Sequence, residues 1–363
     1  MSRPFSIQSL IEDALGEIIN PGDAARSFFV DNHSPRYAMG RNEDTLAVNR
    51  VIPLDGLIDD YFPGDQWHGI PIIKTDHALA GALVINTSTS ISPVDVDKAL
   101  SRMPHLKSVG LHQVIAASQG LLNWPRFVKQ MRDEIREHLD AWVALYEQLA
   151  DEQSRQTLRD TLLFRLTANP RYMRDYRVRT DEQYFEQFMG YTREVFVDAG
   201  GYDGDTTEAF CKRYPDYRKV FFFEPSLQNM TAARQRLNTV RDVHYRNLGL
   251  SDVAGTLSFD SGSGSASAIQ NSGMDLITVN TLDQVVNEPV TFIKMDLEGW
   301  ELKALAGAQM HITQDRPKLA LAVYHQAADF RLIHDYVSSF DHGYKVYLRH
   351  YTQGWSETVM FFR

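Results

Sequence analysis

Residues 195–206, VFVDAGGYDGDT, join an apolar run to a glycine-rich loop, and the helix-forming stretch TTEAFCKRY follows. A glycine loop between a buried strand and a helix is typical of the ligand-binding turn of an open α/β sheet. The apolar runs KVFFFEP (219–225), VTFIKM (290–295) and PKLALAVYH (317–325) repeat the strand pattern, with helical stretches between them. We therefore predict a doubly wound α/β sheet over residues 191–363, with ligands at the carboxyl ends of its strands.

The last part of this region departs from the alternation of strands and helices. Two strand-like segments with no helix between them, GYKVYLRHY (343–351) and SETVMFF (356–362), predict a C-terminal antiparallel hairpin. The run SGSGSASAIQNSG (261–273) is too small and polar to build a core. We expect it to be either a lid over the site or a disordered excursion.

The first 190 residues predict a smaller α/β domain at 1–125 and a helical connector at 126–190. The expected strands run over 49–60, 69–75 and 81–88, and the expected helices over 7–19, closed by Asn20-Pro21-Gly22, and over 92–103. In the connector, apolar residues recur at three- and four-residue steps from Met131 to Leu149, which favours a long amphipathic helix. Strands that alternate with helices imply a parallel sheet in the first domain as well.

Composition excludes several classes of protein. The formal net charge of −10 argues against a general nucleic-acid binder, which needs a basic face to neutralise phosphates. No run of about 18 apolar residues predicts a membrane span, and the N-terminus carries acidic residues where a signal peptide needs an apolar stretch. The lone Cys211 rules out an internal disulfide and fits a reducing cytosol, so we expect a cytoplasmic protein. The sequence leaves open whether the protein forms oligomers.

The glycine loop matches a dinucleotide-binding fingerprint only in part, because Ala199 stands where its first glycine should be, before Gly201 and Gly204. Three carboxylates also lie in or beside the loop: Asp198, Asp203 and Asp205. Beside a phosphate, each unpaired carboxylate costs on the order of 4 kcal/mol at an effective dielectric constant of about 20. No lysine or arginine lies between 195 and 211 to offset them, so this loop favours a cationic ligand, S-adenosylmethionine.

Glu224 is the predicted ribose ligand. It follows Gly204 by 20 positions (224 − 204), where an acid at the end of the second strand accepts hydrogen bonds from both ribose hydroxyls. This position does not by itself separate S-adenosylmethionine from NAD, because both carry the ribose diol.

Together, FVDAGGYDGDT, FFFEPS, NTLDQV, IKMDLEGWELKALAGA and YLRHY…ETVMFF resemble the FkbM family of methyltransferases over about 195–363. The resemblance implies a class I methyltransferase fold that uses S-adenosylmethionine and generally methylates a hydroxyl oxygen. It implies that Asp198, Gly200, Gly201 and Gly204 line the methionine end of the cofactor, and Glu224 its ribose. The loop has Gly201-Tyr202 where the family commonly has GAN, which leaves the contacts of the Tyr202 side chain open.

The adenine commonly rests near the end of the third strand in such folds, so Leu248 and Ser251 are either contacts of the adenine or ordinary turn residues. In the first domain, IDDYFPGDQWHGIPII (58–73) resembles segments of Rossmann-like domains attached to sugar-processing proteins. This domain could bind part of the acceptor or serve only as a docking scaffold.

The predicted catalytic residues stand at two strand ends. The segment KMDLEGWE places Lys294, Asp296 and Glu298 at a strand end and its turn, where Asp296 or Glu298 could act as a base or orient the acceptor hydroxyl. His325 ends the next strand and is a further candidate base, ahead of His350. A metal site of Asp296, Glu298 and His325 has no ligand spacing that demands it, so we predict none.

Four basic and aromatic residues, Tyr172, Arg177, Arg179 and Tyr184, gather before the second domain and either pin an anionic substrate or form a solvated face. The leading hypothesis is an S-adenosylmethionine-dependent O-methyltransferase whose acceptor is a small molecule, a sugar or a glycan, the sugar resting on analogy alone. The alternatives are an NAD-dependent oxidoreductase acting on a nucleotide sugar, and a cofactor-binding module without catalysis.

Overall fold

The computed structural model describes residues 6–31, 33–259 and 275–363. The chain divides into two compact units, each built from segments that are not consecutive in the sequence. Unit 1 comprises residues 1–146, 156–178 and 350–356, and unit 2 comprises 147–155, 179–349 and 357–363. The segment 261–273, expected to be a lid or an excursion, lies outside the described residues.

Unit 1 contains a sheet of order β3-β4-β2-β1-β5-β6, in which every pairing except β3–β4 is parallel. Its strands are β1 (Arg36–Met39), β2 (Gly56–Ile58), β3 (Gln66–Trp67), β4 (Ile70–Ile73), β5 (Leu83–Asn86) and β6 (Lys107–Gly110). Its first helices are α1 (Ile7–Gly16), α2 (Gly22–Val30), α3 (Glu43–Val51), α4 (Pro93–Ser101) and α5 (Leu111–Ala117).

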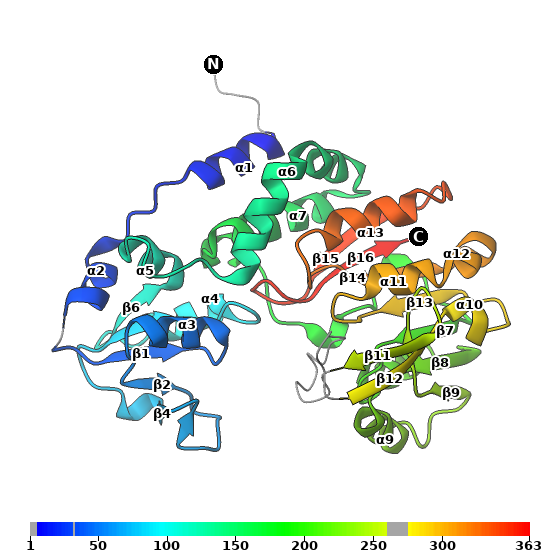
Figure 1. Cartoon of the computed structure of the whole chain (residues 1–363), viewed down its shortest axis with the longest axis horizontal. Helices are drawn as coiled ribbons and strands as arrows, with labels where there is room; N and C mark the ends of the chain where they lie inside the picture. Colours follow the sequence, from blue (N-terminus) through cyan, green and yellow to red (C-terminus); the bar gives the residue numbers. More distant parts are fainter. Residues whose placement is uncertain (1–5, 32, 260–274) are drawn as a thin grey trace. The chain divides into compact units, whose positions relative to one another are not determined.

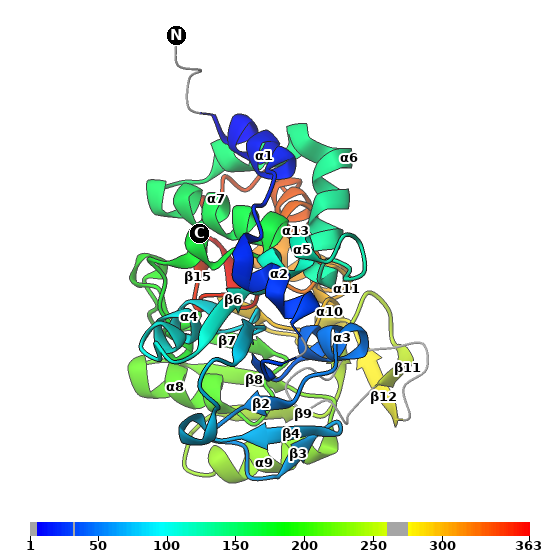
Figure 2. The same ribbon diagram turned by 90° about the vertical axis from the view of Figure 1, so that its left-hand side faces the viewer.

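Helices cover both faces of this sheet (Figures 1 and 2). Phe28 of α2, Val48 of α3 and Val114 of α5 belong to one buried cluster with sheet residues, whereas Leu100 of α4 belongs to a second cluster. A third cluster joins α6 (Arg126–Gln148) and α7 (Glu152–Thr167), whose far ends continue into unit 2. The parallel sheet predicted for the first domain is confirmed, apart from the antiparallel pairing of β3 with β4.

Two local predictions in unit 1 are wrong. The strand expected over 49–60 is only Gly56–Ile58, because the residues from Asn49 to Val51 complete helix α3, which Asn42 caps through its side chain. The first helix, expected over 7–19, ends at Gly16, and Ile18 beyond it is 95% exposed. In both cases the local apolar pattern did not reveal where the helix ends.

A buried carboxylate in unit 1 predicts a dependence of stability on pH. Asp44 is 7% exposed and accepts a hydrogen bond from Thr89 at 2.7 Å, and burial raises its pKa to about 6. A raised carboxyl pKa means that the folded state binds more protons than the unfolded state between about pH 4 and 6, so this group's contribution to stability is lost as the pH rises through that window. We expect Asp44→Asn to be more stable than the wild type by about 2 kcal/mol at pH 8, as measured by urea unfolding.

The same two proteins at pH 4 provide the control for this prediction. Asp44 is then protonated in the folded state and partly protonated in the unfolded state, so the difference between the two free energies of unfolding should shrink to a small fraction of its value at pH 8. A variant that is less stable than the wild type at pH 8 would contradict the prediction.

Unit 2 contains a sheet of order β15-β16-β14-β13-β7-β8-β9, parallel from β14 to β9, with β16 antiparallel to β14. Its strands are β7 (Val195–Ala199), β8 (Lys219–Phe223), β9 (Val243–Arg246), β13 (Phe292–Met295), β14 (Lys318–Ala322), β15 (Val346–His350) and β16 (Thr358–Phe362). The helices of this unit are α8 (Asp205–Arg213), α9 (Leu227–Arg236), α10 (Leu282–Val285), α11 (Glu301–Ala306), α12 (Gln309–Asp315) and α13 (Asp329–Ser338). A small second sheet has the order β10-β12-β11, from Gly249–Leu250, Asp275–Asn280 and Gly255–Phe259.

Aromatic residues fix α8 and α9 to one face of the larger sheet. Phe210 of α8 packs on Phe196, and Phe222 lies in a cluster with Met230 of α9. Phe196 and Phe222 lie on neighbouring strands two registered positions apart, and therefore on the same face. Strand order reverses between β7 and β13, so their carboxyl ends form the topological switch point, where doubly wound sheets bind ligands.

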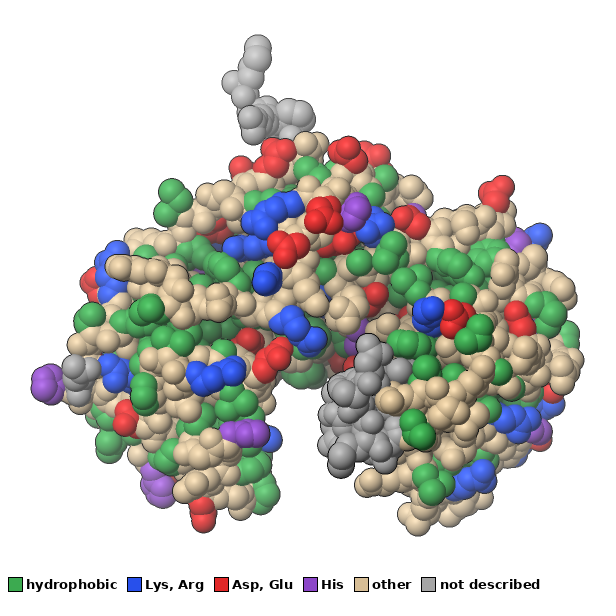
Figure 3. All heavy atoms as spheres, in the orientation of Figure 1, with side chains coloured by type: hydrophobic (Ala, Val, Ile, Leu, Met, Phe, Trp, Pro, Cys, Tyr) green, Lys and Arg blue, Asp and Glu red, His purple; other side chains and the backbone are tan. Residues whose placement is uncertain are grey.

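The surface carries no single dominant charge on the face that Figure 3 shows. Basic and acidic side chains lie interspersed over the residues drawn there in colour. Within the described ranges, no helix combines the length and the apolar character that crossing a membrane requires.

Candidate active site

The glycine loop lies directly against the turn after β13. Gly200 has φ +76°, and a Cβ atom there would lie 1.9 Å from the carbonyl oxygen of Asp296. At Gly201, a Cβ atom would lie 2.1 Å from the ring of Phe222. These two glycines are therefore required by close packing between the loop and its neighbours, whatever ligand binds above them.

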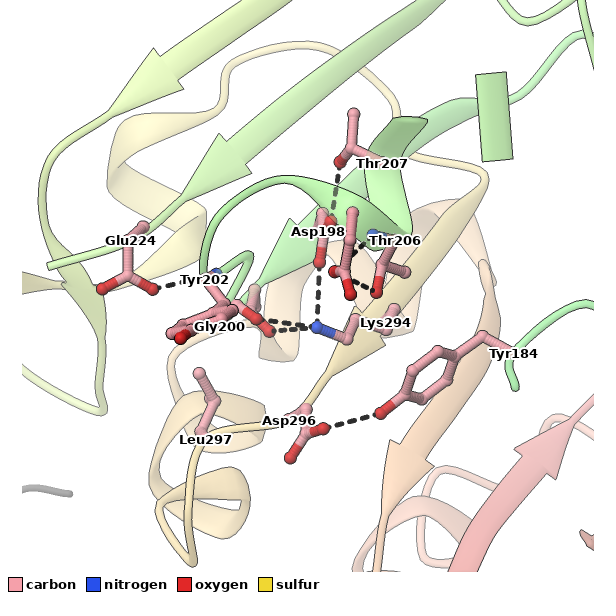
Figure 4. A network of polar contacts seen from close by, with 12 residues as sticks. Tyr184, Asp198, Gly200, Tyr202, Thr206, Thr207, Glu224, Lys294, Asp296 and Leu297 are labelled. Carbon is pink, nitrogen blue, oxygen red and sulfur yellow. Dashed lines mark hydrogen bonds and ion pairs between the residues drawn. The ribbon is translucent and has the colours of Figure 1, made fainter. Parts of the chain in front are cut away.

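Asp198 lies beneath this loop in a fully enclosed polar network (Figure 4). It is opposite Lys294 in the β7–β13 register, and the Nζ of Lys294 lies 3.0 Å from its Oδ1. The hydroxyl of Thr207 donates to its Oδ2 at 2.6 Å, and Lys294 also donates to the carbonyl oxygen of Gly200 at 2.8 Å. The side chains of Lys294 and Asp198 are 3% and 0% exposed, so the pair holds the loop against the sheet.

These contacts correct the electrostatic prediction made from the loop alone. Lys294 neutralises Asp198, and Arg236 of α9 pairs with Asp203 at 2.6 Å. Burial alone would lower the pKa of Lys294, but the facing Asp198 carboxylate raises it above its usual value, so the lysine stays charged. Two of the three loop carboxylates are therefore balanced by cations from other elements and do not select a cationic ligand.

Glu224 lies at the end of β8 beside the loop, as Figure 4 shows. Its Oε2 accepts a hydrogen bond from the backbone N–H of Tyr202 at 3.0 Å, and its Oε1 accepts one from the N–H of Ser226 at 2.8 Å. The residue is 5% exposed, and burial raises its pKa above the usual value. Each carboxylate oxygen has two lone pairs, so Glu224 keeps capacity for further donors such as ribose hydroxyls.

The remaining residues predicted to bind the cofactor lie in different surroundings. Tyr202 has φ +50°, and its side chain is 37% exposed next to Glu224. Leu248 is partly buried in the turn after β9. Ser251 is 2% exposed, and its hydroxyl accepts from the indole N–H of Trp300 at 3.2 Å, so protein atoms already enclose its side chain.

Asp296 stands at the other side of the switch point, at the end of β13. The hydroxyl of Tyr184 donates to its Oδ2 at 2.7 Å (Figure 4), and the hydroxyl of Tyr324 donates to its Oδ1 at 3.4 Å. Tyr184 is 4% exposed, and burial raises its pKa well above the usual value, so it remains a hydrogen-bond donor. The sequence reasoning grouped Tyr184 with a surface cluster, and its contact with Asp296, 112 positions away, was not foreseen.

His325 follows β14 and is surrounded by carboxylates. Its Nε2 lies 3.4 Å from Asp296 Oδ1 and 3.4 Å from Glu298 Oε2, and its Nδ1 lies 3.1 Å from Glu301 Oε1. Burial alone would lower the pKa of His325, but these carboxylates raise it to about 10. Burial and the neighbouring acids raise the pKa of Glu298 to about 7. Of the predicted catalytic residues, Asp296, Glu298 and His325 therefore come together, while Lys294 lies beneath the loop.

Four of the eleven described residues other than glycine that have positive φ lie around this site. Tyr184, Tyr202, Glu298 and Glu357 all have positive φ values, of 72°, 50°, 54° and 65° respectively. Such conformations cost of order 1–3 kcal/mol each for residues other than glycine, and they concentrate at functional sites. Glu357 accepts a hydrogen bond from Gln183 at 2.9 Å and interacts electrostatically with Asp296.

Several other predicted residues lie elsewhere. His350 belongs to unit 1, where it packs edge-on against Tyr176 and contacts the hydroxyl of Thr352 at 3.2 Å. Tyr172 and Arg177 also belong to unit 1, whereas Arg179 and Tyr184 belong to unit 2. Within unit 2, Arg179 pairs with Glu182 at 3.0 Å.

Comparison with known proteins identifies the larger part of unit 2. The model of the methyltransferase FkbM domain family matches residues 198–346. Residues 198–346 form a methyltransferase FkbM domain. This domain contains both the glycine loop and the cluster around His325, and the match gives no support to the NAD-dependent oxidoreductase alternative.

One solved structure agrees with the fold over nearly the whole chain. The crystal structure of methyltransferase FkbM from Methylobacillus flagellatus KT is 23% identical, with a TM-score of 0.75, and the match covers 98% of this chain and 99% of that chain. An rRNA methylase from Streptococcus thermophilus is 18% identical with a TM-score of 0.32, over 47% of this chain and 86% of that chain. No curated protein matches the sequence. The predicted methyltransferase fold around the FkbM domain is confirmed.

Proposed function

We propose that the protein is an S-adenosylmethionine-dependent O-methyltransferase. The observation that carries this proposal is the Glu224 carboxylate, held by two backbone N–H groups beside the glycine loop at the switch point of an FkbM domain. An acid in this place accepts hydrogen bonds from a ribose diol. The FkbM match favours the methyl donor over NAD as the molecule that carries this ribose.

The residues present fit this cofactor. Glu224 retains acceptor capacity, and Gly200 and Gly201 bring the loop backbone close to the ends of β13 and β8. Asp198 and Lys294 take a positioning role, because their buried pair holds the loop in its conformation. S-adenosylmethionine, when bound, supplies a methyl group that is activated by its sulfonium.

The acceptor side of the site is rich in groups that bind or deprotonate a hydroxyl. Asp296 and Glu298 stand 22% and 26% exposed at the end of β13, on the opposite side of the switch point from Glu224. A carboxylate there would orient the acceptor hydroxyl and receive its proton as the methyl group is transferred, which supports oxygen as the methylated atom. A sugar or glycan acceptor is the class we infer by analogy with the family.

Glu224→Gln tests the cofactor assignment. Two charge-assisted hydrogen bonds to the ribose contribute about 1.5–3 kcal/mol each, and the new amide N–H₂ would also face the N–H donors that now hold the carboxylate. We expect the dissociation constant for S-adenosylhomocysteine, measured by calorimetry, to rise by about 10²-fold or more.

Glu208→Gln is the matched control, because Glu208 lies in the first turn of α8 and pairs outward with Lys212 at 2.7 Å. It should leave the dissociation constant within about twofold of the wild type. Wild-type protein that binds NAD but not S-adenosylhomocysteine would overturn the proposed function.

A further inference from the structure

The surroundings of His325 are rich in carboxylates. Asp296, Glu298 and Glu301 all lie within 3.4 Å of its ring, and Glu357 interacts with it electrostatically. Buried carboxylates are normally paired or bound to a metal ion, because like charges that share a site repel one another. One imidazole therefore stands at ion-pair distance from three acids.

The His325 ring is itself unsatisfied. Its side chain is only 6% exposed, and its Nε2 makes no hydrogen bond to any described residue, although two acids stand at ion-pair distance from it. The Nε2 atom points between Asp296 and Glu298. A buried imidazole nitrogen rarely lacks a hydrogen bond, so this nitrogen is directed at a partner other than the protein.

The spacing of the three facing atoms suits a divalent cation. Asp296 Oδ1, Glu298 Oε2 and His325 Nε2 lie within 4.8 Å of one another, and the nitrogen is 3.4 Å from each oxygen. Adjacent ligands at about 2.1 Å from an octahedral ion lie about 3.0 Å apart, so the distances from Nε2 to the two oxygens are within a few tenths of an ångström of that spacing. Two carboxylates and one imidazole are donors that Mn²⁺ accepts readily.

The second layer of contacts also resembles that of a metal site. Glu301 Oε1 lies 3.1 Å from Nδ1, on the side of the ring away from Asp296 and Glu298, and Glu301 is held by the backbone N–H of Leu297 at 2.6 Å. A carboxylate behind the distal nitrogen commonly orients a metal-bound histidine. Tyr184 likewise occupies Oδ2 of Asp296, whereas Oδ1 accepts only the longer hydrogen bond from Tyr324, at 3.4 Å, and lies 3.4 Å from His325 Nε2.

We propose that Asp296, Glu298 and His325 bind one divalent cation of the Mn²⁺ or Mg²⁺ type, with Glu301 as the residue that positions His325. Three protein ligands leave coordination positions open. If the proposed methyl transfer is correct, these positions would bind the acceptor hydroxyl oxygen, and the cation would stabilise the negative charge that develops there. The cation site itself does not depend on that role.

Mn²⁺ alone is the probe that tests this inference. The full chain, treated with EDTA and desalted, is titrated with Mn²⁺ while free Mn²⁺ is followed by electron paramagnetic resonance. We expect one bound ion per chain, with affinity at least about tenfold weaker in Glu298→Gln and in His325→Ala, and about 10- to 100-fold weaker in Glu301→Gln. Glu298→Gln preserves shape at a partly exposed position, so it remains informative if the histidine variant fails to fold.

Asp335→Asn is the matched control, because Asp335 lies 3.0 Å from the buried His334 in the same unit but is 56% exposed. It should bind Mn²⁺ like the wild type. Absence of binding in the wild type, or equal binding in Glu298→Gln, would overturn the inference. Binding of S-adenosylhomocysteine is measured separately: Mn²⁺ binding without it refutes the proposed function alone, and the reverse result refutes the cation site alone.

Discussion

Gly200→Ala is expected to lower the free energy of unfolding by about 4 kcal/mol or more and to abolish binding of S-adenosylhomocysteine. The new Cβ atom would lie 1.9 Å from the carbonyl oxygen of Asp296, which is a backbone atom and cannot rotate away. The loop must therefore shift from the end of β13, and it carries the Tyr202 N–H that holds Glu224. Thermal unfolding and calorimetric titration measure the two effects.

Alanine substitutions at two other glycines of unit 2 separate the two causes of this loss, which are the backbone conformation and the close contact with Asp296. Gly343 has φ +68°, and a Cβ atom there would meet no other atom within 4 Å, so Gly343→Ala isolates the cost of the backbone conformation, about 1–2 kcal/mol. Gly255 has neither a positive φ nor a close neighbour, and its alanine variant should be neutral or stabilising by up to about 1 kcal/mol. If Gly200→Ala proves no more destabilising than Gly343→Ala, the close approach to Asp296 is not a structural requirement.

Lys294→Met is expected to lower the free energy of unfolding by about 3–5 kcal/mol, because it leaves Asp198 as an unpaired charge in a fully buried place. It also removes the donor to the carbonyl oxygen of Gly200. The double variant Asp198→Asn with Lys294→Met removes both charges and should recover more than half of the loss. Urea unfolding of the wild type, Asp198→Asn, Lys294→Met and the double variant gives the coupling energy as a double-mutant cycle.

An exposed ion pair of the same unit is the control for this cycle. Lys303 lies 2.8 Å from Asp252, with side chains 54% and 32% exposed, so Lys303→Met should cost less than about 1 kcal/mol. Additive effects of the Asp198 and Lys294 substitutions would show that the two charges are not coupled.

The sequence predicts those parts of the candidate site that depend only on residues close to one another along the chain. The glycine loop at 200–204, the acid at 224 and the strand ends at 296 and 325 all follow from apolar runs and turn residues. The structure has strands that end directly before 200, 224 and 296, and β14 ends three positions before 325. The fold class followed in the same way, because alternating strands and helices admit few topologies. The FkbM resemblance over 195–363 agrees with the family match over 198–346.

The charge balance of the loop was predicted wrongly because only residues close in the sequence were considered. Asp198 meets Lys294 through the register of β7 and β13, two strands that are adjacent in the sheet but 96 positions apart at this pair (294 − 198). Arg236 reaches Asp203 from the next helix. Alternation along each strand could have placed Asp198 and Lys294 on one face, but only with the strand order and register already known.

The sequence by itself determined where strands give way to turns and which acids and glycines stand at those turns, because periodicity and turn chemistry are local properties. Only the tertiary structure decided which charges meet. It paired Asp198 with Lys294 instead of with a ligand, brought Tyr184 to Asp296, and surrounded His325 with Asp296, Glu298 and Glu301. These contacts depend on sheet register and on loop paths that bring distant residues within a few ångströms, and their energies depend on burial, which no local pattern specifies.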